Sequence, residues 1–371
     1  MILSFKVTTK YRIYCPWIQG RAQHAGYEVV QNYVSLAQKL NISIDVMLLY
    51  KSFFVRVYNK ILTKSLFSYP PIHIICSLPM ILYLLSRSKK LTKILYVEPH
   101  TILSLYATSL FDRNFGLIIH DDPICFLSRH GMSDQRQDYY SKKFSNCLNN
   151  ARFGFVISQY MIDAYRLDNK DRFQVLHISY HDVTRESRAL KLEDQLVLGL
   201  FGQPHAQPSN VKPPDPIRLI AKLGVIKNRL KIKIFNCNFA YLEQNIETFT
   251  WLDERNYFKQ VDKCNLSLVD DNPADINFAN YSFPTKLVFS LSRAIPIIYT
   301  GPEKSAVADY IIKNNIGITI APGCSEAIED ALSKVRINYT EFSENCTKVY
   351  FRDFSYDNAL CKIRKVLNYH D

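Results

Sequence analysis

One stretch of the sequence combines residue types that could bind an anion. In "YSFPTKLVFSLSRAIPIIYTG", Pro284 and Lys286 open an apolar run that predicts a helix, and the next predicted strand, 296–299, leads into Thr300 and Gly301. A lysine is unfavourable in the first turn of a helix, because the helix dipole attracts anions there. A bound anion that shares the helix amides with the ammonium group would reverse this preference. By spacing alone, a core helix with an exposed lysine is the more frequent explanation.

A histidine at a strand end is the second candidate group. The run "FGLIIHDD" predicts a strand that ends at His120 and is followed by Asp121 and Asp122. The imidazole could simply be packed beside aspartates that cap the next helix, or it could face a ligand cleft. In that case the aspartates could orient it or bind hydroxyl groups of a ligand.

The sequence offers no convincing metal site. The nine cysteines are scattered without a C-x-x-C pair, which favours free thiols in a reducing cytoplasm over a disulfide framework or a structural zinc. The segment "VDDNPAD", Asp270 to Asp275, is acidic enough to suggest a metal. We interpret it as a solvated loop, because carboxylates in turn-rich segments usually face water.

Short apolar strands alternate with helical patterns along the chain, which predicts parallel sheets covered on both faces. The pattern pauses at a polar segment, 181–195. With 371 residues, we expect two Rossmann-like doubly wound domains that face a central cleft. The predicted limits are 1–185 and 196–350, with a C-terminal helix over 351–371 that could pack back on the first domain. The run "PIHIICSLPMILYLLS", 71–86, predicts a buried strand followed by a helix.

Charge is unevenly distributed. Residues 1–100 contain 13 Lys or Arg and 3 Asp or Glu, a balance of +10, whereas the whole chain carries +12. Such a basic lobe suggests a polyanionic neighbour: nucleic acid, an anionic membrane surface or phosphate-bearing substrates. We find no recognisable nucleic-acid-binding module, no apolar run of about 18 residues that could cross a bilayer, and no apolar N-terminal segment typical of a signal peptide.

The segment around Lys286 resembles the donor-site segment of GT-B glycosyltransferases, in the large retaining group that includes many bacterial polysaccharide-assembly enzymes. Their pattern runs approximately as Ser-Pro-x-Lys-Leu-x-Glu-Tyr-x-Ala-x-Gly-x-Pro-Ile-Ile, followed by a glycine loop. The matching residues here are Tyr281, Ser282, Pro284, Lys286, Leu287, Pro296, Ile297, Ile298 and Gly301. The resemblance implies that Lys286 contacts the donor phosphates. Phe289 stands where the family usually has the glutamate that binds the ribose, and Ala294 replaces the usual glycine.

Other segments extend the resemblance in the expected order along the chain. "LGLFGQP" is similar to the strand and loop that open the donor domain, with Gly202 and Gln203 at the loop. "LIIHDDP" is similar to the strand whose histidine, here His120, reaches the transferred sugar. In "WIQGRAQHAGYEVV", residues Gly20, Arg21 and Gly26 match a glycine-rich turn against the phosphates and the acceptor. His24 lies where inverting relatives often place a catalytic base, and a neutral imidazole suits that role. The C-terminal motif favours a retaining reaction.

The resemblance implies a hexosyltransferase-type enzyme that needs neither cofactor nor metal. It would move a sugar from a nucleotide-diphosphate sugar to a hydroxyl of a glycan or lipid-linked glycan. A sugar-nucleotide epimerase of the same fold and a non-catalytic partner subunit are the alternatives.

A basic amphipathic helix indicates where such an enzyme could meet a membrane. In "KSFFVRVYNKILTKSLF", the cations Lys51, Arg56, Lys60 and Lys64 fall near one helical face. This pattern is typical of a membrane-surface helix, and a core helix with outward lysines is roughly as frequent. We therefore expect a cytoplasmic protein held peripherally on the inner face of the cell membrane.

Overall fold

The chain forms two compact units, which are described separately. Unit 1 comprises Met1–Ile178 and Ala359–Asp371, and unit 2 comprises Ser179–Asn358. The computed structural model describes residues 11–15, 25–40, 44–48, 61, 64, 70–86, 92–129, 131–165, 170–180, 183, 186, 188–190, 194–201, 230–235, 244–249, 252–271, 276–281, 283–320 and 325–368. The domain limits expected from the sequence stay a prediction.

Unit 1 is built on a parallel sheet. Its described part has six strands in the order β2-β1-β3-β4-β5-β6. The strands are β1 (Tyr11–Cys15), β2 (Ile44–Leu48), β3 (Thr92–Tyr96), β4 (Phe115–Ile119), β5 (Phe153–Val156) and β6 (Phe173–Val175). The helices are α1 (Ala25–Lys39), α3 (Pro70–Ser86), α4 (Ile102–Phe111), α5 (Pro123–Arg129), α6 (Asp134–Asn150) and α7 (Gln159–Ala164), with the short 3-10 helices η1 (Pro99–Thr101) and η2 (Lys170–Arg172). Every residue of β3, β4 and β5 is buried, which explains why β4 and β5 are continuous apolar runs. β3 begins with the buried polar residues Thr92 and Lys93.

The C-terminal helix α14 (Tyr356–Asn368) belongs to unit 1 from Ala359 onward. The Tyr11 hydroxyl of β1 donates a hydrogen bond to the Leu367 carbonyl at 3.3 Å. A segment from the end of the chain is thereby tied to the first strand.

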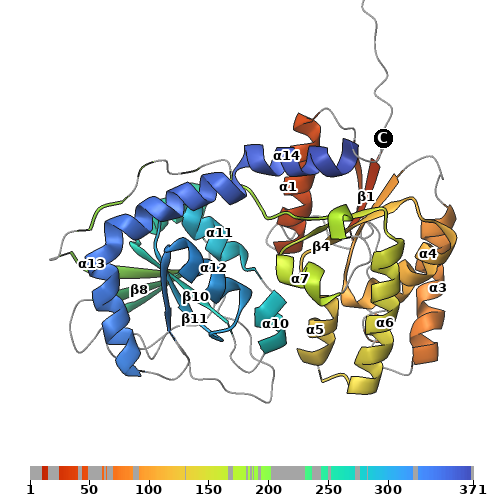
Figure 1. Cartoon of the computed structure of the whole chain (residues 1–371), viewed down its shortest axis with the longest axis horizontal. Helices are drawn as coiled ribbons and strands as arrows, with labels where there is room; N and C mark the ends of the chain where they lie inside the picture. The colour runs from red at the N-terminus through yellow and green to blue at the C-terminus, as the bar shows by residue number, and fades with distance from the viewer. Residues whose placement is uncertain are drawn as a thin grey trace, which may run out of the picture. The chain divides into compact units, whose positions relative to one another are not determined.

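Unit 2 repeats the architecture with a second parallel sheet. Its described strands follow the order β12-β11-β10-β7-β8-β9. They are β7 (Leu196–Leu200), β8 (Leu230–Phe235), β9 (Ile246–Phe249), β10 (Leu266–Asp270), β11 (Ile297–Thr300) and β12 (Gly317–Ile320). The helices are α9 (Glu254–Val261), α10 (Ile276–Tyr281), α11 (Thr285–Ser292), α12 (Ala306–Asn314) and α13 (Ser325–Val349), followed by the π-helical turn η3 (Tyr350–Phe354) (Figure 1).

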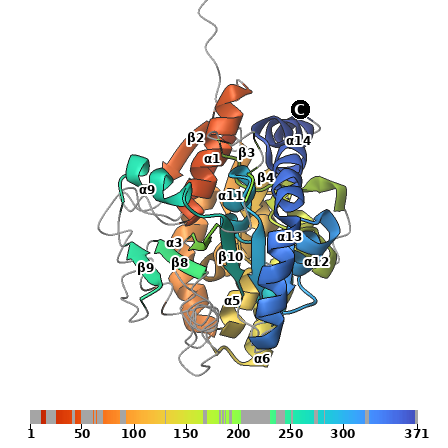
Figure 2. The same cartoon turned by 90° about the vertical axis from the view of Figure 1, so that its left-hand side faces the viewer.

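Two apolar clusters cover the two faces of this second sheet. On one face, α13 packs its residues Ile328, Val335 and Tyr339 against the strands. On the other face, an aromatic cluster includes Phe201, Phe235 and Phe289 with Val261 of α9. Figure 2 shows α9 and α13 on opposite sides of the strands. Unit 2 is therefore a three-layer α/β unit.

Each sheet has a point where the strand order reverses. In sheet 1 it lies between β1 and β3, and in sheet 2 between β7 and β10. In open parallel sheets, ligands bind beyond the carboxyl ends of the strands at such points. The segments that follow β3 and β10 are therefore the candidate ligand-binding regions.

One predicted element is wrong. The segment predicted as a buried strand followed by a helix is the single helix α3, which contains Pro79. Its histidine and its internal proline suggested two elements, but the helix continues through Pro79, and its buried positions follow a helical spacing, at His73, Ser77, Met80 and Leu84.

Candidate active site

Lys286 lies in the first turn of α11, as the sequence predicts, and Pro284 is the N-cap residue of that helix. The hydroxyls of Ser290 and Ser267 form a hydrogen bond of 2.7 Å, which fixes α11 on β10. The Lys286 ammonium donates to the Asp270 carbonyl at 3.0 Å and to the Asp270 carboxylate at 2.6 Å. The lysine is therefore held at the carboxyl end of β10, next to the reversal of strand order.

Asp270 and Asp271 are not solvated, so the interpretation of the acidic segment as a solvated loop is wrong for these two residues; residues 272–275 lie outside the described ranges. The Asp270 side chain is 13% exposed in its ion pair with Lys286, and Asp271 is buried. The Tyr299 hydroxyl donates to the Asp271 carboxylate at 3.0 Å. Burial and the nearby Asp271 carboxylate raise the pKa of Tyr299. Asp270 therefore connects the end of β10 to α11, and Asp271 connects it to Tyr299 of β11.

Position 301 requires a glycine because the Tyr299 side chain lies against its backbone. A Cβ atom at this position would lie 2.3 Å from the Tyr299 hydroxyl oxygen. That hydroxyl also shares a hydrogen bond of 2.9 Å with Ser305, and the Ser305 side chain accepts from the Ala308 amide as the N-cap of α12. The glycine thus allows Tyr299 to connect the end of β10 with the start of α12.

Thr300 supplies a polar group at the same strand end. Its hydroxyl is buried and has no hydrogen-bond partner within the described ranges of the chain. A buried hydroxyl without a partner carries a free-energy cost, which a ligand oxygen at this point would remove.

The two departures from the family pattern have structural reasons. Phe289 is 8% exposed and packs edge-to-face against Phe201 and Tyr180, with ring centroids 5.1 and 5.5 Å apart. The side chain at this position therefore belongs to the core of unit 2. Ala294 keeps the left-handed backbone that the usual glycine would adopt, with φ 53°.

In unit 1, His120 follows the last residue of β4 and is 9% exposed. Asp121 is exposed, whereas Asp122 is buried. The Asp122 carboxylate accepts hydrogen bonds from the Ile124 and Cys125 amides and from the Tyr165 hydroxyl. Burial raises the pKa of Asp122, and these hydrogen bonds oppose the rise. Asp122 therefore caps α5.

Glu98 is a candidate that sequence reasoning missed. β3 and β4 pair with Tyr96 opposite Ile118, so Glu98 lies two residues beyond β3 as His120 lies two beyond Ile118. Burial, with the neighbouring Asp121 carboxylate, raises the pKa of the half-buried Glu98. Its position directly after an apolar strand, in "ILYVEPH", was the available signal.

The other predicted site residues are mostly not placed. Gly26 lies in α1 and Lys64 is exposed in a helical position. The remaining predicted residues lie outside the described ranges: Gly20, Arg21, His24, Lys51, Arg56, Lys60, Gly202, Gln203 and Ser282. Within those ranges, no three His, Cys, Asp or Glu side chains gather as metal ligands.

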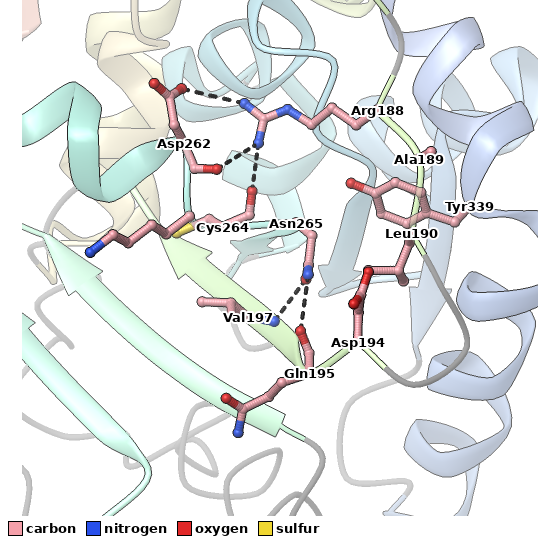
Figure 3. A pocket seen from close by; sticks show the side chains of 11 residues that line it. Arg188, Ala189, Leu190, Asp194, Gln195, Val197, Asp262, Cys264, Asn265 and Tyr339 are labelled. Atoms are coloured by element: carbon pink, nitrogen blue, oxygen red, sulfur yellow. Dashed lines mark hydrogen bonds and ion pairs between the residues drawn. The ribbon is translucent and has the colours of Figure 1, made fainter.

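A polar pocket of about 670 Å³ lies elsewhere, at the amino ends of β7 and β10 (Figure 3). Arg188 donates to the Arg293 and Cys264 carbonyls at 2.9 and 2.8 Å and pairs with the Asp262 carboxylate at 3.5 Å. Its guanidinium group is thus engaged by unit 2 itself. The pocket is at the edge opposite to the one where parallel sheets bind ligands, and we assign Arg188 a structural role.

Two doubly wound α/β units with parallel sheets define the class of this protein. Known structures with this architecture match nearly the whole chain. Sucrose-phosphate synthase from Thermosynechococcus elongatus has a TM-score of 0.62 at 10% identity, covering 97% of this chain and 98% of that one. HepE from Anabaena, in complex with UDP-glucose, has a TM-score of 0.57 at 12% identity, with coverages of 97% and 99%. WaaG, a glycosyltransferase involved in lipopolysaccharide biosynthesis, has a TM-score of 0.56 at 11% identity, with coverages of 96% and 99%.

The chain therefore has the GT-B fold, as the sequence predicts. Neither a protein-family model nor a curated protein sequence matches it.

Proposed function

We propose that this protein is a glycosyltransferase that moves a sugar from a nucleotide-diphosphate sugar to a hydroxyl of a glycan or lipid-linked glycan in surface polysaccharide biosynthesis. The observation that carries the proposal is the position of Lys286 at the mouth of α11, beside the strand-order reversal of a GT-B donor unit. HepE, which has the same fold, is solved with UDP-glucose, which supports a donor of this kind.

The chemistry requires stabilisation of the negative charge that develops on the leaving diphosphate. An ammonium group has three donor hydrogens, and Asp270 accepts from Lys286 at two atoms. The third hydrogen can be directed to a phosphate oxygen. The first amides of α11 and α12 provide further donors and the positive ends of two helix dipoles. Thr300 offers its hydroxyl at the same edge of the sheet.

Unit 1 would supply the groups that act on the transferred sugar and the acceptor. We assign His120 to the transferred sugar and Asp121 to the acceptor hydroxyl, because both follow β4 at the ligand-binding edge of sheet 1. Glu98, whose raised pKa favours the protonated carboxyl, can donate a hydrogen bond there. The donor motif favours a retaining outcome.

Loss of the Lys286 ammonium should weaken nucleotide binding selectively. In Lys286→Met, we expect the free energy of nucleotide binding to become less favourable by about 1.5–3 kcal/mol, which is the contribution of one charge-assisted hydrogen bond. The matched control is Lys93→Met, because the Lys93 ammonium forms a similar buried ion pair, 2.5 Å from Asp112, in unit 1. Both variants remove the ammonium partner of a largely buried carboxylate, so both should lose thermal stability.

The measurement is thermal stabilisation by UDP, by GDP and by a panel of their sugars. Stabilisation that survives in Lys93→Met and is lost in Lys286→Met supports the proposal. Equal stabilisation of the two variants would remove Lys286 from the donor site.

A further inference from the structure

The helix α3 presents its apolar side to solvent. Ile75 and Leu82 are each 65% exposed, and Ile72, Leu78 and Ile74 are 48%, 47% and 41% exposed. The opposite side of the helix is buried and contains His73 and Ser77, both at 0% exposure. In an ordinary surface helix the apolar stripe faces the core and the polar side faces water. α3 departs from this arrangement, because it exposes apolar side chains over about three turns on its outer side while its buried side contains His73 and Ser77 beside the apolar Met80 and Leu84.

The exposed residues form one continuous stripe. At 100° per residue, positions 75, 78 and 82 lie within a narrow sector, and 72 and 74 flank it. α3 contains no charged residue. It packs against α4, which ends with the exposed residues Leu110 and Phe111, and it lies at the edge of unit 1 in Figure 1. Contiguous exposed apolar surface of this kind marks an interaction site.

The sequence around α3 is strongly basic. From residue 46 to residue 97 the chain has eight lysines or arginines and no aspartate or glutamate. Lys93 is buried in its ion pair with Asp112, which leaves seven cations, including Arg87, Lys89 and Lys90 directly after the helix. An apolar stripe with flanking cations is the combination that binds anionic lipid surfaces. A second copy of the same face would instead bring like charges together.

We propose that the outer face of α3 is a membrane-docking surface, whose apolar stripe enters the interfacial region of an anionic lipid bilayer while the flanking cations contact the headgroups. With 17 residues, α3 is shorter than the roughly 20 apolar residues of a spanning helix. No helix in the described part of the chain is both long and apolar enough to cross a membrane. Because the opposite side of α3 is packed in unit 1, with His73 and Ser77 at 0% exposure, the docked helix would lie along the membrane surface. This inference gives a location to the lipid-linked acceptor of the proposed function, and it stands on separate observations.

The test is co-sedimentation with vesicles of phosphatidylcholine alone and of phosphatidylcholine mixed with phosphatidylglycerol. The wild-type protein should bind the anionic vesicles and be released by high salt, because the headgroup attraction is screened. Ile75→Asn/Leu82→Asn should bind at least about tenfold more weakly, because two apolar side chains no longer enter the bilayer. The matched control is Ile312→Asn/Ile337→Asn, which replaces isoleucines of unit 2 that are 63% and 77% exposed. It should bind like the wild type.

Three results would overturn the proposal: no binding of wild type to anionic vesicles at low salt, equal loss in the two double variants, or a wild-type dimer in sedimentation velocity that the α3 variant lacks. The last result would show that a second copy covers the stripe. All variants should keep nucleotide-dependent thermal stabilisation. A protein that docks normally but transfers no sugar would refute the proposed function and leave the docking surface intact.

Discussion

Phe289 shows at the residue scale why a family pattern cannot be transferred without its packing. An acidic side chain at this position would lie among Phe201, Tyr257 and Phe258, whose ring centroids are 5.1–6.4 Å from that of Phe289. In the proposed donor complex, the ribose would therefore be held by a residue other than Phe289.

Replacing Phe289 by the glutamate that is usual in the family pattern should destabilise unit 2. We expect Phe289→Glu to lower the free energy of unfolding of unit 2 by at least about 3 kcal/mol, because it removes a buried ring and buries a carboxylate. Phe289→Leu, which keeps an apolar side chain, should cost less. Urea unfolding measures both. A stable Phe289→Glu protein with tighter nucleotide binding would show that the ribose contact of the family is possible here.

The ion pair of Lys286 with Asp270 was not predicted, although the position of the lysine was. The start of α11 can be predicted from local sequence, because Pro284 directly precedes the apolar run. Its partner lies 16 residues earlier, at the end of a strand that meets α11 only after the chain has folded. The acidic segment was expected to face water because turn-rich carboxylates usually do, and a cation in the adjacent helix overrides that tendency.

At the scale of elements, α3 is the helix that the sequence analysis predicted wrongly, and its buried side contains the polar residues His73 and Ser77. His73 of α3 lies edge-to-face against Tyr140 of α6, with centroids 5.8 Å apart. His100 in η1 is buried, and its Nε2 has no hydrogen-bond partner among the residues described. Burial and the proximity of His73 lower the pKa of His100 to about 4.

Unit 1 should therefore lose stability in mild acid. The unfolded chain binds a proton at His100 near pH 6.5, whereas the folded chain resists protonation down to about pH 4. Stability from this group is complete above the unfolded pKa and is lost as pH falls through that window. Between pH 7 and pH 5 the loss is about 2 kcal/mol. Urea unfolding of wild type and His100→Gln at both pH values measures it. An identical pH dependence in the two proteins would contradict the assignment.

At the scale of the whole molecule, the alternation of strands and helices was enough to predict two parallel α/β units. The strands β3, β4, β5, β10 and β11 coincide with the short runs of β-prone residues from which the sequence predicts strands. The strand order was not predicted, because no local sequence pattern specifies that β10 and β8 pair with opposite edges of β7. That order places Lys286 and Glu98 beside the reversal points of their sheets.

Sugar transfer should not require a bound divalent metal. Lys286 and the helix amino termini can neutralise the diphosphate, so chelation by EDTA should leave turnover unchanged. Activity that is abolished by EDTA and restored by magnesium or manganese would contradict this and would direct attention to Asp270, Asp271 and Asp275.

The most direct test of the central claim is transfer of radiolabelled sugar by the purified protein. Nucleotide sugars labelled in the sugar are incubated with a lipid-linked glycan fraction, and the label is followed into the acceptor, the nucleotide sugar and free sugar. We predict that label from one donor enters the glycan with release of nucleoside diphosphate, and that Lys286→Met loses this transfer while Lys93→Met retains it. Label that remains on the nucleotide but appears in an epimeric sugar, or label that stays in the intact donor for every sugar and acceptor fraction tested, would contradict a glycosyltransferase.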